Sequence, residues 1–179
     1  MRHHSEPLNA TIFRTRLGWM TIFGRAETLT RLHFGATSQR EARRRAEEEM
    51  GGDLCFTDWN PELVMRLQRY AAGEGDDFRD VKVDTTGLTQ FSRKVLTRCR
   101  KIPAGETTTY GQLAEKVGSP GAARAVGSVM SRNRIPIVIP CHRVVGSNGK
   151  LTGFTAPGGC DMKRRMLELE ASCCELAEA

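Results

Sequence analysis

Long apolar runs are absent from this chain of 179 residues. No segment approaches the ~20 consecutive apolar residues that a helix needs to cross a bilayer. The first residues lack the charged and apolar pattern of a signal peptide, and the chain contains no internal repeats or low-complexity tracts. We therefore expect a soluble, cytoplasmic protein with no membrane partner. A hydrophobic content of 39% is enough to bury a sizeable core.

The six cysteines lack the regular spacing of a disulfide framework, which is typical of a protein from a reducing compartment. A tight metal-ligand pattern is also missing. His3, His4, His33 and Cys55 are suitable residue types for zinc, but their spacing matches no known ligand set. We therefore expect neither a metal nor another cofactor.

Positive charge is unevenly distributed along the chain. The net charge is +6, but residues 1–86 carry −1 and residues 87–179 carry +7. The division follows the linker expected at 84–87, which separates an N-terminal structural domain over 1–86 from a C-terminal functional domain over 87–179. The excess in the second half favours a polyanionic partner, nucleic acid first.

The chain begins with patterns typical of a small α/β domain. Alternating apolar and polar residues predict three strands within residues 10–36. A helix is expected over Gln39–Met50, with Ser38 as its N-cap and glycines after its end. Basic residues followed by acidic residues one turn later, within 43–49, indicate a solvated, salt-bridged helix face rather than a nucleic-acid site.

The rest of the first half is expected to contain one more helix and one more strand. The helix begins at Pro61 and ends near Gly73. Residues 74–80 have the polar composition of a surface loop, and residues 81–83 are expected to form a last strand before a linker. No catalytic constellation stands out in this half.

The second half is expected to be helical up to its central motif. One helix follows Thr89 and ends at the turn 103–105. Two short helices follow, over 110–117 and 121–131, and the Gly-Ser-Pro turn between them gives a helix-turn-helix outline.

The second helix of this pair is rich in small residues, with several alanine, glycine and serine residues, and Arg124 is its one long charged side chain. A helix of small residues can approach the narrow minor groove of DNA and leave one long side chain to enter the base stack. Tight packing of the same helix against a neighbour inside the protein explains the composition equally well.

A reactive cysteine is indicated by the segment 135–145. An extended, apolar core run that contains two prolines leads into Cys141, which is followed by His142 and Arg143. Nearby positive charge would lower the thiol pKa from about 8.5 toward a reactive thiolate. The turn at 147–149 is of the kind that closes a hairpin. A buried, inert cysteine is the ordinary alternative, but burial of histidine and arginine beside it favours a functional site.

These motifs together resemble the O6-alkylguanine-DNA alkyltransferases, also called methylated-DNA–protein-cysteine methyltransferases. The resemblance covers about residues 88–170 and rests on IPCHRV at 139–144, TYGQLA at 109–114, GAARAVGSVMSRN at 121–133 and KRRMLELE at 163–170. It implies an α/β fold, with a small ribonuclease-H-like N-terminal domain and a mainly helical C-terminal domain that contains a winged helix-turn-helix-like motif. It also implies single-turnover repair of double-stranded DNA that bears O6-alkylguanine, and possibly O4-alkylthymine.

The resemblance further implies the roles of individual residues. Cys141 would accept the alkyl group, His142 would take the thiol proton, and Glu170 would orient His142, as in other activated cysteines. Tyr110 would donate a proton to guanine N3, and Asn133 would tie the recognition helix to the cysteine segment. Contacts with DNA would come from Thr109, Gln112, Ala123, Arg124, Gly127, Ser128 and Arg132, and the alkylguanine pocket from Met130, Val144, Val145, Phe154 and Thr155.

This chain departs from the family pattern in the loop that should line the pocket. The segment 155–159 is about two residues longer than in human-type members, and Phe154 stands where tyrosine is frequent. The resemblance therefore leaves the accepted alkyl size undetermined.

Three other functions were weighed against repair. A lesion-binding sensor would typically carry tryptophan in place of Cys141. An alkylation-responsive regulator would need longer reading side chains on its recognition helix. A cysteine hydrolase would use the same Cys-His-Glu residue types on acyl substrates. The small-residue helix over 121–131 and the basic second half favour DNA repair. We expect the protein to be monomeric.

Overall fold

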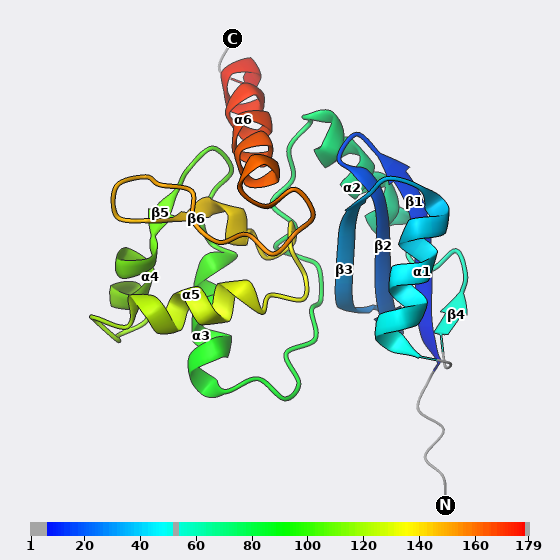
Figure 1. Cartoon of the computed structure of the whole chain (residues 1–179), viewed down its shortest axis with the longest axis horizontal. Helices are drawn as coiled ribbons and strands as arrows, with labels where there is room; N and C mark the ends of the chain where they lie inside the picture. Colours follow the sequence, from blue (N-terminus) through cyan, green and yellow to red (C-terminus); the bar gives the residue numbers. More distant parts are fainter. Residues whose placement is uncertain (1–6, 52–53, 178–179) are drawn as a thin grey trace, which may run out of the picture.

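The structure is a computed structural model that describes residues 7–51 and 54–177. A four-stranded sheet with helices on both faces occupies one side of the molecule, and a mainly helical part occupies the other (Figure 1). The sheet order is β3-β2-β1-β4, where β1 is Leu8–Thr15, β2 is Gly18–Arg25, β3 is Thr28–Ala36 and β4 is Leu54–Phe56. The expected α/β class is confirmed.

The three strands predicted within residues 10–36 form an antiparallel meander. Each strand extends beyond the short apolar segment that indicates it in the sequence. The sequence reasoning missed β4, which pairs in parallel with β1 over only three residues. A strand of three residues is too short to show alternation in the sequence.

Helix α1 (Gln39–Met50) covers one face of the sheet above a small apolar cluster of Leu8, Ala10, Phe23 and Ala46. Its predicted bounds and its Ser38 cap are confirmed. The charged face also forms as expected, because Arg43 pairs with Glu47 and Arg44 with Glu48 one turn apart.

Helix α2 (Pro61–Ala72) packs on the other side of the sheet, and its bounds match the prediction. Its buried residues Leu63, Leu67 and Tyr70 join the main core. This core continues into the second half of the chain, where it includes Val95, Val126 and Met166. The two halves therefore share one apolar interior.

The outer edge of β3 is closed by segments that follow later in the chain. The backbone of Leu29 bonds to Lys82 and Asp84, and the Leu32 amide bonds to the Arg134 carbonyl. The predicted strand over 81–83 is wrong, because only a single bridge between Leu29 and Val83 forms. The chain leaves the sheet edge at once for the second half, so no ladder develops.

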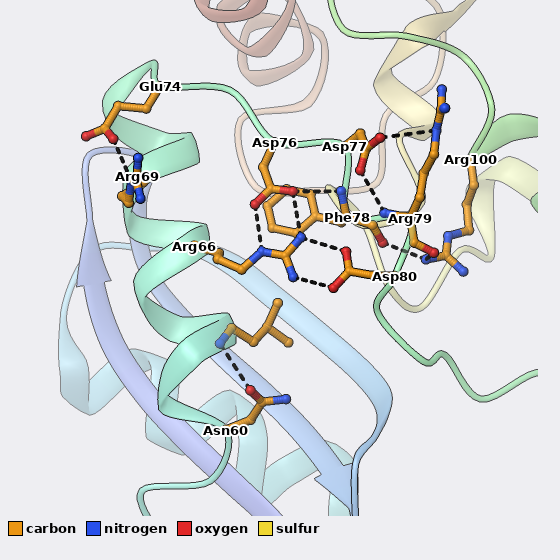
Figure 2. Close-up of polar contacts among 11 residues, drawn as sticks. Asn60, Arg66, Arg69, Glu74, Asp76, Asp77, Phe78, Arg79, Asp80 and Arg100 are labelled. Carbon is orange, nitrogen blue, oxygen red and sulfur yellow. Dashed lines mark hydrogen bonds and ion pairs between the residues drawn. The ribbon is translucent and has the colours of Figure 1, made fainter.

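The segment 74–80 is more than the expected surface loop, because Phe78 within it is buried, with 1% of its surface exposed. Arg66 of α2 holds the segment through Asp76 and Asp80, with four nitrogen–oxygen distances of 2.7–2.8 Å (Figure 2). Arg100 donates to the carbonyl oxygens of Phe78 and Val81 from the second half. Charged side chains thus fix a loop whose composition alone suggested solvent exposure.

The second half contains α3 (Gln90–Cys99), α4 (Tyr110–Lys116), α5 (Ala123–Ser131) and α6 (Gly159–Ala177). Helix α3 ends earlier than predicted, because residues 100–102 form turns before Pro103. Helices α4 and α5 contact each other and α3, which confirms the helix-turn-helix outline (Figure 1). The strands β5 (Thr108–Thr109) and β6 (Val144–Val145) form a short parallel pair beside them.

The apolar run before Cys141 is not the extended segment that its branched residues predict. Residues 134–139 form consecutive turns, and Ile137 has a positive φ of 72°. Prolines 136 and 140 remove two backbone donors, so the chain bonds to itself over short spans instead of joining a sheet. The expected hairpin is likewise reduced to a tight turn, in which the Gly149 amide bonds to the Gly146 carbonyl and the Gly146 amide to the Lys150 carbonyl, because β6 pairs with β5.

Candidate active site

The inner face of α6 supplies the polar groups that surround the cysteine segment. Lys163, Met166 and Glu170 are three and four residues apart, so they lie on one side of the helix. All three are buried, with 0–2% of their surface exposed. The 3-10 turn η1 (Cys141–Arg143) lies against this face and is buried throughout.

Glu170 is the centre of a buried hydrogen-bond network. Its Oε1 lies 2.8 Å from His142 Nε2 and accepts a bond of 2.8 Å from Arg143 Nη2. Its Oε2 accepts a bond of 2.9 Å from Arg143 Nε. A further bond of 2.7 Å to Oε1 comes from the hydroxyl of Tyr70 on α2. The predicted pairing of His142 with Glu170 is present, within a larger set of partners than predicted.

The charges in this network follow from burial and pairing. Burial alone would raise the pKa of Glu170, but the hydrogen bonds and charges of His142 and Arg143 outweigh it and lower this pKa to about 2. Burial lowers the pKa of His142, and Glu170 opposes this only in part. At neutral pH the carboxylate is therefore charged and paired with Arg143, while the imidazole is neutral.

This charge state fixes the tautomer of His142. The neutral ring carries its proton on Nε2, where it donates to Glu170, so Nδ1 keeps its lone pair. Nδ1 is buried and has no hydrogen-bond partner among the described residues. The imidazole is therefore oriented as a base with its accepting atom available.

The pKa of Cys141 does not follow the expectation from sequence. Burial raises it, and this effect outweighs the opposing influence of Asn133, of the Lys163 charge and of nearby backbone amides. Arg143 does not supply the expected activation, because its guanidinium is committed to Glu170. The expected thiolate is therefore wrong for the resting protein, in which Cys141 is a thiol that requires a base.

Asn133 links the end of α5 to the cysteine segment, as predicted. Its Nδ2 donates to the Ile139 carbonyl at 2.8 Å, and its Oδ1 accepts from the Ile135 amide at 3.0 Å. These two bonds hold the turns on which the position of Cys141 depends.

Tyr110 begins α4 and is half-buried, with its hydroxyl 3.4 Å from the Thr152 carbonyl oxygen. Burial raises its pKa, so the phenol keeps its proton at neutral pH. Lys163, which the sequence reasoning did not single out, lies with its amine 5.8 Å from the centre of this ring. The same amine donates to the carbonyls of Val144 and Thr152.

A cleft of about 600 Å³ opens onto Cys141 between the two halves. Phe154 and Thr155 line it, whereas Met130, Val144 and Val145 of the predicted pocket are buried in the core and do not. Phe154 also packs against Phe34 of β3, with ring centres 6.3 Å apart. The first half therefore supports the loop that carries two predicted pocket residues.

The predicted DNA-contacting residues lie on or near α4 and α5. Arg124, Ser128 and Arg132 are exposed, and Ala123 and Gly127 are partly exposed. Thr109 and Gln112 form the capping box at the start of α4, in which the Gln112 Oε1 accepts from the Thr109 amide. The Nε2 group of Gln112 is not part of this capping interaction.

In the part of the chain that the structure describes, no three His, Cys, Asp or Glu side chains come together to hold a metal ion. His3 and His4, considered above as zinc ligands, lie outside those residues. The same part contains no helix long and apolar enough to span a membrane.

Comparisons with known proteins agree with this geometry. The family described as "6-O-methylguanine DNA methyltransferase, DNA binding domain" matches residues 90–172. The methylated-DNA–protein-cysteine methyltransferase of Mycobacterium tuberculosis is 40% identical over 162 residues, which cover 87% of this chain and 88% of the relative. The chain belongs to this family.

Further members of the methylated-DNA–protein-cysteine methyltransferase family are similar to it. The methyltransferase of Methanosarcina acetivorans is 48% identical over 112 residues, 63% of this chain and 69% of that protein. The crystal structure of Mycobacterium tuberculosis OGT in complex with DNA is 37% identical, with a TM-score of 0.77 over 92% of this chain and 94% of that one. The archaeal Pyrococcus kodakaraensis O6-methylguanine-DNA methyltransferase is 26% identical, with a TM-score of 0.67 over 91% of this chain and 98% of that one.

Two features of the site could not be found by the sequence reasoning. Tyr70 has helical spacing with the buried Leu63 and Leu67, and this spacing indicates burial in the core and no catalytic role. Lys163 lies in a charged run in which no local pattern distinguishes it from its exposed neighbours Arg164 and Arg165.

Proposed function

We propose that this protein repairs DNA by transferring a methyl or other alkyl group from O6 of guanine to Cys141, once per molecule. One observation carries the proposal: in a chain of this family, a buried Cys141 borders a cleft and adjoins an oriented His142–Glu170 pair. The names of the relatives describe the same reaction on methylated DNA.

The transfer proceeds by in-line displacement at the alkyl carbon. His142 Nδ1 takes the thiol proton, directly or through a water, as the sulfur attacks. The new S–C bond forms while the C–O6 bond breaks, and its electron pair moves onto the purine. Tyr110 donates its hydroxyl proton to N3 of the leaving guanine, and the proton held by His142 restores the phenol through solvent. The Glu170 carboxylate stabilises the imidazolium in the interval, and Arg143 holds that carboxylate in place.

The product of this reaction explains its single turnover. An alkylated cysteine is a thioether, which has no leaving group comparable to that of a hydrolysable thioester. Each protein molecule therefore repairs one lesion and remains alkylated.

The DNA-facing surface is proposed to centre on α5. A stacked base hides its alkyl group, so the lesion must leave the helix before Cys141 can reach it. The small residues Ala123, Gly127 and Ser128 allow α5 to approach the minor groove, and the exposed Arg124 fills the space left by the extruded nucleotide. The side chains of Gln112, Thr109 and Arg132 would contact the phosphate backbone of the DNA.

A second basic surface supports binding to a polyanion. Exposed cations from α3 and the end of α4 line a shallow groove, to which no acidic side chain of the described residues contributes; they are Arg93, Lys94, Arg98, Lys101 and Lys116. Phosphate contacts of this kind add affinity that falls steeply with salt and carries little sequence preference.

The domain division at residue 86 is retained as a proposal, with the first half as support and the second half as the DNA-binding and transfer unit. A cytoplasmic location and a monomeric state remain predictions.

The test is a titration of limiting protein against a duplex that contains one O6-methylguanine, with the restored guanine quantified by chromatography after digestion. Repair predicts that guanine recovered equals protein added and then stops. Tight lesion-preferring binding without restored guanine would favour the sensor function. Turnover on an activated acyl ester without DNA repair would favour the hydrolase.

A further inference from the structure

Tyr70 is a residue of the first half that reaches the catalytic network of the second. It lies near the end of α2, is 2% exposed, and donates its hydroxyl to Glu170 Oε1 at 2.7 Å. The Tyr70 hydroxyl oxygen also lies 3.4 Å from His142 Nε2. Burial and the Glu170 charge raise the pKa of this phenol far above its usual value, so it remains a hydrogen-bond donor at any pH at which the protein works.

The position of this phenol is fixed from outside the catalytic segment. The Phe78 ring packs against it edge-on, with centroids 5.7 Å apart. Phe78 is in turn held by the loop that Arg66 clamps through Asp76 and Asp80, and Arg100 binds the Phe78 carbonyl from the second half (Figure 2). A clamped loop thus backs the ring, so the hydroxyl approaches Glu170 from a fixed direction.

We propose that Tyr70 is a positioning residue for alkyl transfer, through which the first half of the chain holds Glu170 and His142 in their reactive arrangement. The inference rests on the proposed function, because it concerns the base in that reaction. It gives the N-terminal half a part in positioning the catalytic groups, beyond support of the fold.

The physical reason lies in how Glu170 Oε1 is shared. This oxygen accepts hydrogen bonds from Tyr70, Arg143 and His142, and the three donors compete for the same lone pairs. Removal of the phenol hydroxyl leaves the carboxylate a stronger acceptor for His142, which favours the imidazolium. The other titratable or charged groups near His142 are Arg143 and Cys141 on its own turn and Lys163 on α6, and none of them replaces the missing donor.

Because only a neutral imidazole can accept the thiol proton, a higher pKa for His142 moves the acid limb of the reaction to higher pH. The phenol also restrains the carboxylate directly, so its loss lets Glu170 and His142 leave the reactive geometry. We expect both effects in Tyr70→Phe, which keeps the ring and its packing.

The experiment measures single-turnover transfer rates from an O6-methylguanine duplex between acidic and alkaline pH. The wild type, Tyr70→Phe and Leu63→Ala are compared at saturating DNA. Leu63→Ala is the matched control, because it removes buried packing from the same helix α2 but keeps Tyr70 and Phe78. Circular dichroism and thermal melts establish that each variant is folded.

The expected result is an acid limb displaced to higher pH and a rate lowered by about tenfold at neutral pH in Tyr70→Phe, which is the scale of one hydrogen bond to a charged group. Leu63→Ala should melt earlier but keep the wild-type pH profile. An unchanged pH profile and rate in Tyr70→Phe, or the same displacement in both variants, would overturn the proposal.

A second readout separates this inference from the proposed function. Titration of the His142 imidazole by NMR in free protein should show a higher pKa in Tyr70→Phe than in the wild type. If the wild type transfers no alkyl group, the proposed function fails, and the titration still decides whether Tyr70 controls His142. Identical titrations in the two proteins would refute the role of Tyr70.

Discussion

Glu170 should make the protein sensitive to acid in a measurable way. Its pKa is held at about 2 in the folded protein, against an ordinary value of 4.5. A group whose pKa is lowered by folding stabilises the protein above its unfolded pKa, and this contribution is lost as the pH falls toward the folded pKa. The stabilisation from Glu170 should therefore be complete at pH 5 and largely lost by pH 2.

The expected magnitude follows from the two pKa values. A difference between 4.5 and about 2 corresponds to about 3 kcal/mol of unfolding free energy, at about 1.4 kcal/mol per pH unit. Solvent screening does not reduce this free energy appreciably, because Glu170 is only 2% exposed. In Glu170→Gln this pH-dependent contribution disappears. The variant also loses about 3–5 kcal/mol at neutral pH, because Arg143 is left buried without its carboxylate.

Urea denaturation of the wild type and Glu170→Gln at several pH values between 5 and 2 provides the assay. The free energy of unfolding should fall by about 3 kcal/mol more in the wild type than in the variant across this range. If Glu170→Gln is too unstable to measure, the paired replacement Glu170→Gln with Arg143→Met removes both charges and should show the same flattened pH dependence. Parallel pH dependence in wild type and variants would refute the assignment of the low pKa to Glu170.

Three further predictions concern DNA binding and the fold. Arg124→Ala should slow transfer from duplex DNA by about tenfold or more, while leaving transfer from the free O6-methylguanine base unchanged in the same single-turnover assay, because Arg124 acts only on stacked DNA. Lys94→Glu combined with Arg98→Glu should weaken binding to undamaged duplex and reduce the salt slope of log K by about two, measured by fluorescence anisotropy. Arg66→Gln should lower the unfolding free energy by about 2 kcal/mol in urea denaturation, since the half-buried contacts of its guanidinium are lost.

Each of these predictions has a control and an outcome that contradicts it. Equal losses on duplex and free base would show that Arg124 acts on the pocket and not on the base stack. For the basic groove, the control is Arg43→Glu with Arg44→Glu, which makes the same change in net charge on α1. A similar loss of DNA affinity in this control would show that net charge, and not the groove, determines binding. Unchanged stability in Arg66→Gln would mean that its ion pairs do not hold the segment 74–80.

Local signals were sufficient for much of the fold. Helices α1 and α2 begin and end where caps, proline and glycine predicted, because these residues satisfy or interrupt backbone hydrogen bonds within one turn. Helix α4 likewise begins at Tyr110 as predicted, and it ends one residue earlier than predicted. The prediction of an extended segment before Cys141 was wrong, because two prolines outweigh the strand preference of its branched residues.

The site was only partly predictable, for a different reason. Cys141, His142 and Asn133 lie in one short segment whose chemistry can be read directly from the sequence. The contact between Tyr70 and Glu170 joins residues 100 positions apart, and no local pattern encodes it. The pKa of Cys141 also depends on tertiary structure, since it was burial and the Arg143–Glu170 pair that reversed the expectation from neighbouring charges.

Intact-protein mass spectrometry, followed by peptide mapping, can detect alkyl transfer to Cys141 after incubation with a duplex that carries one O6-methylguanine. Transfer to Cys141 predicts that each chain gains one methyl group in place of one hydrogen, that the modification maps to Cys141, and that it saturates at one and is absent in Cys141→Ala. An unmodified protein, or a methyl group on another residue that persists in Cys141→Ala, would contradict it.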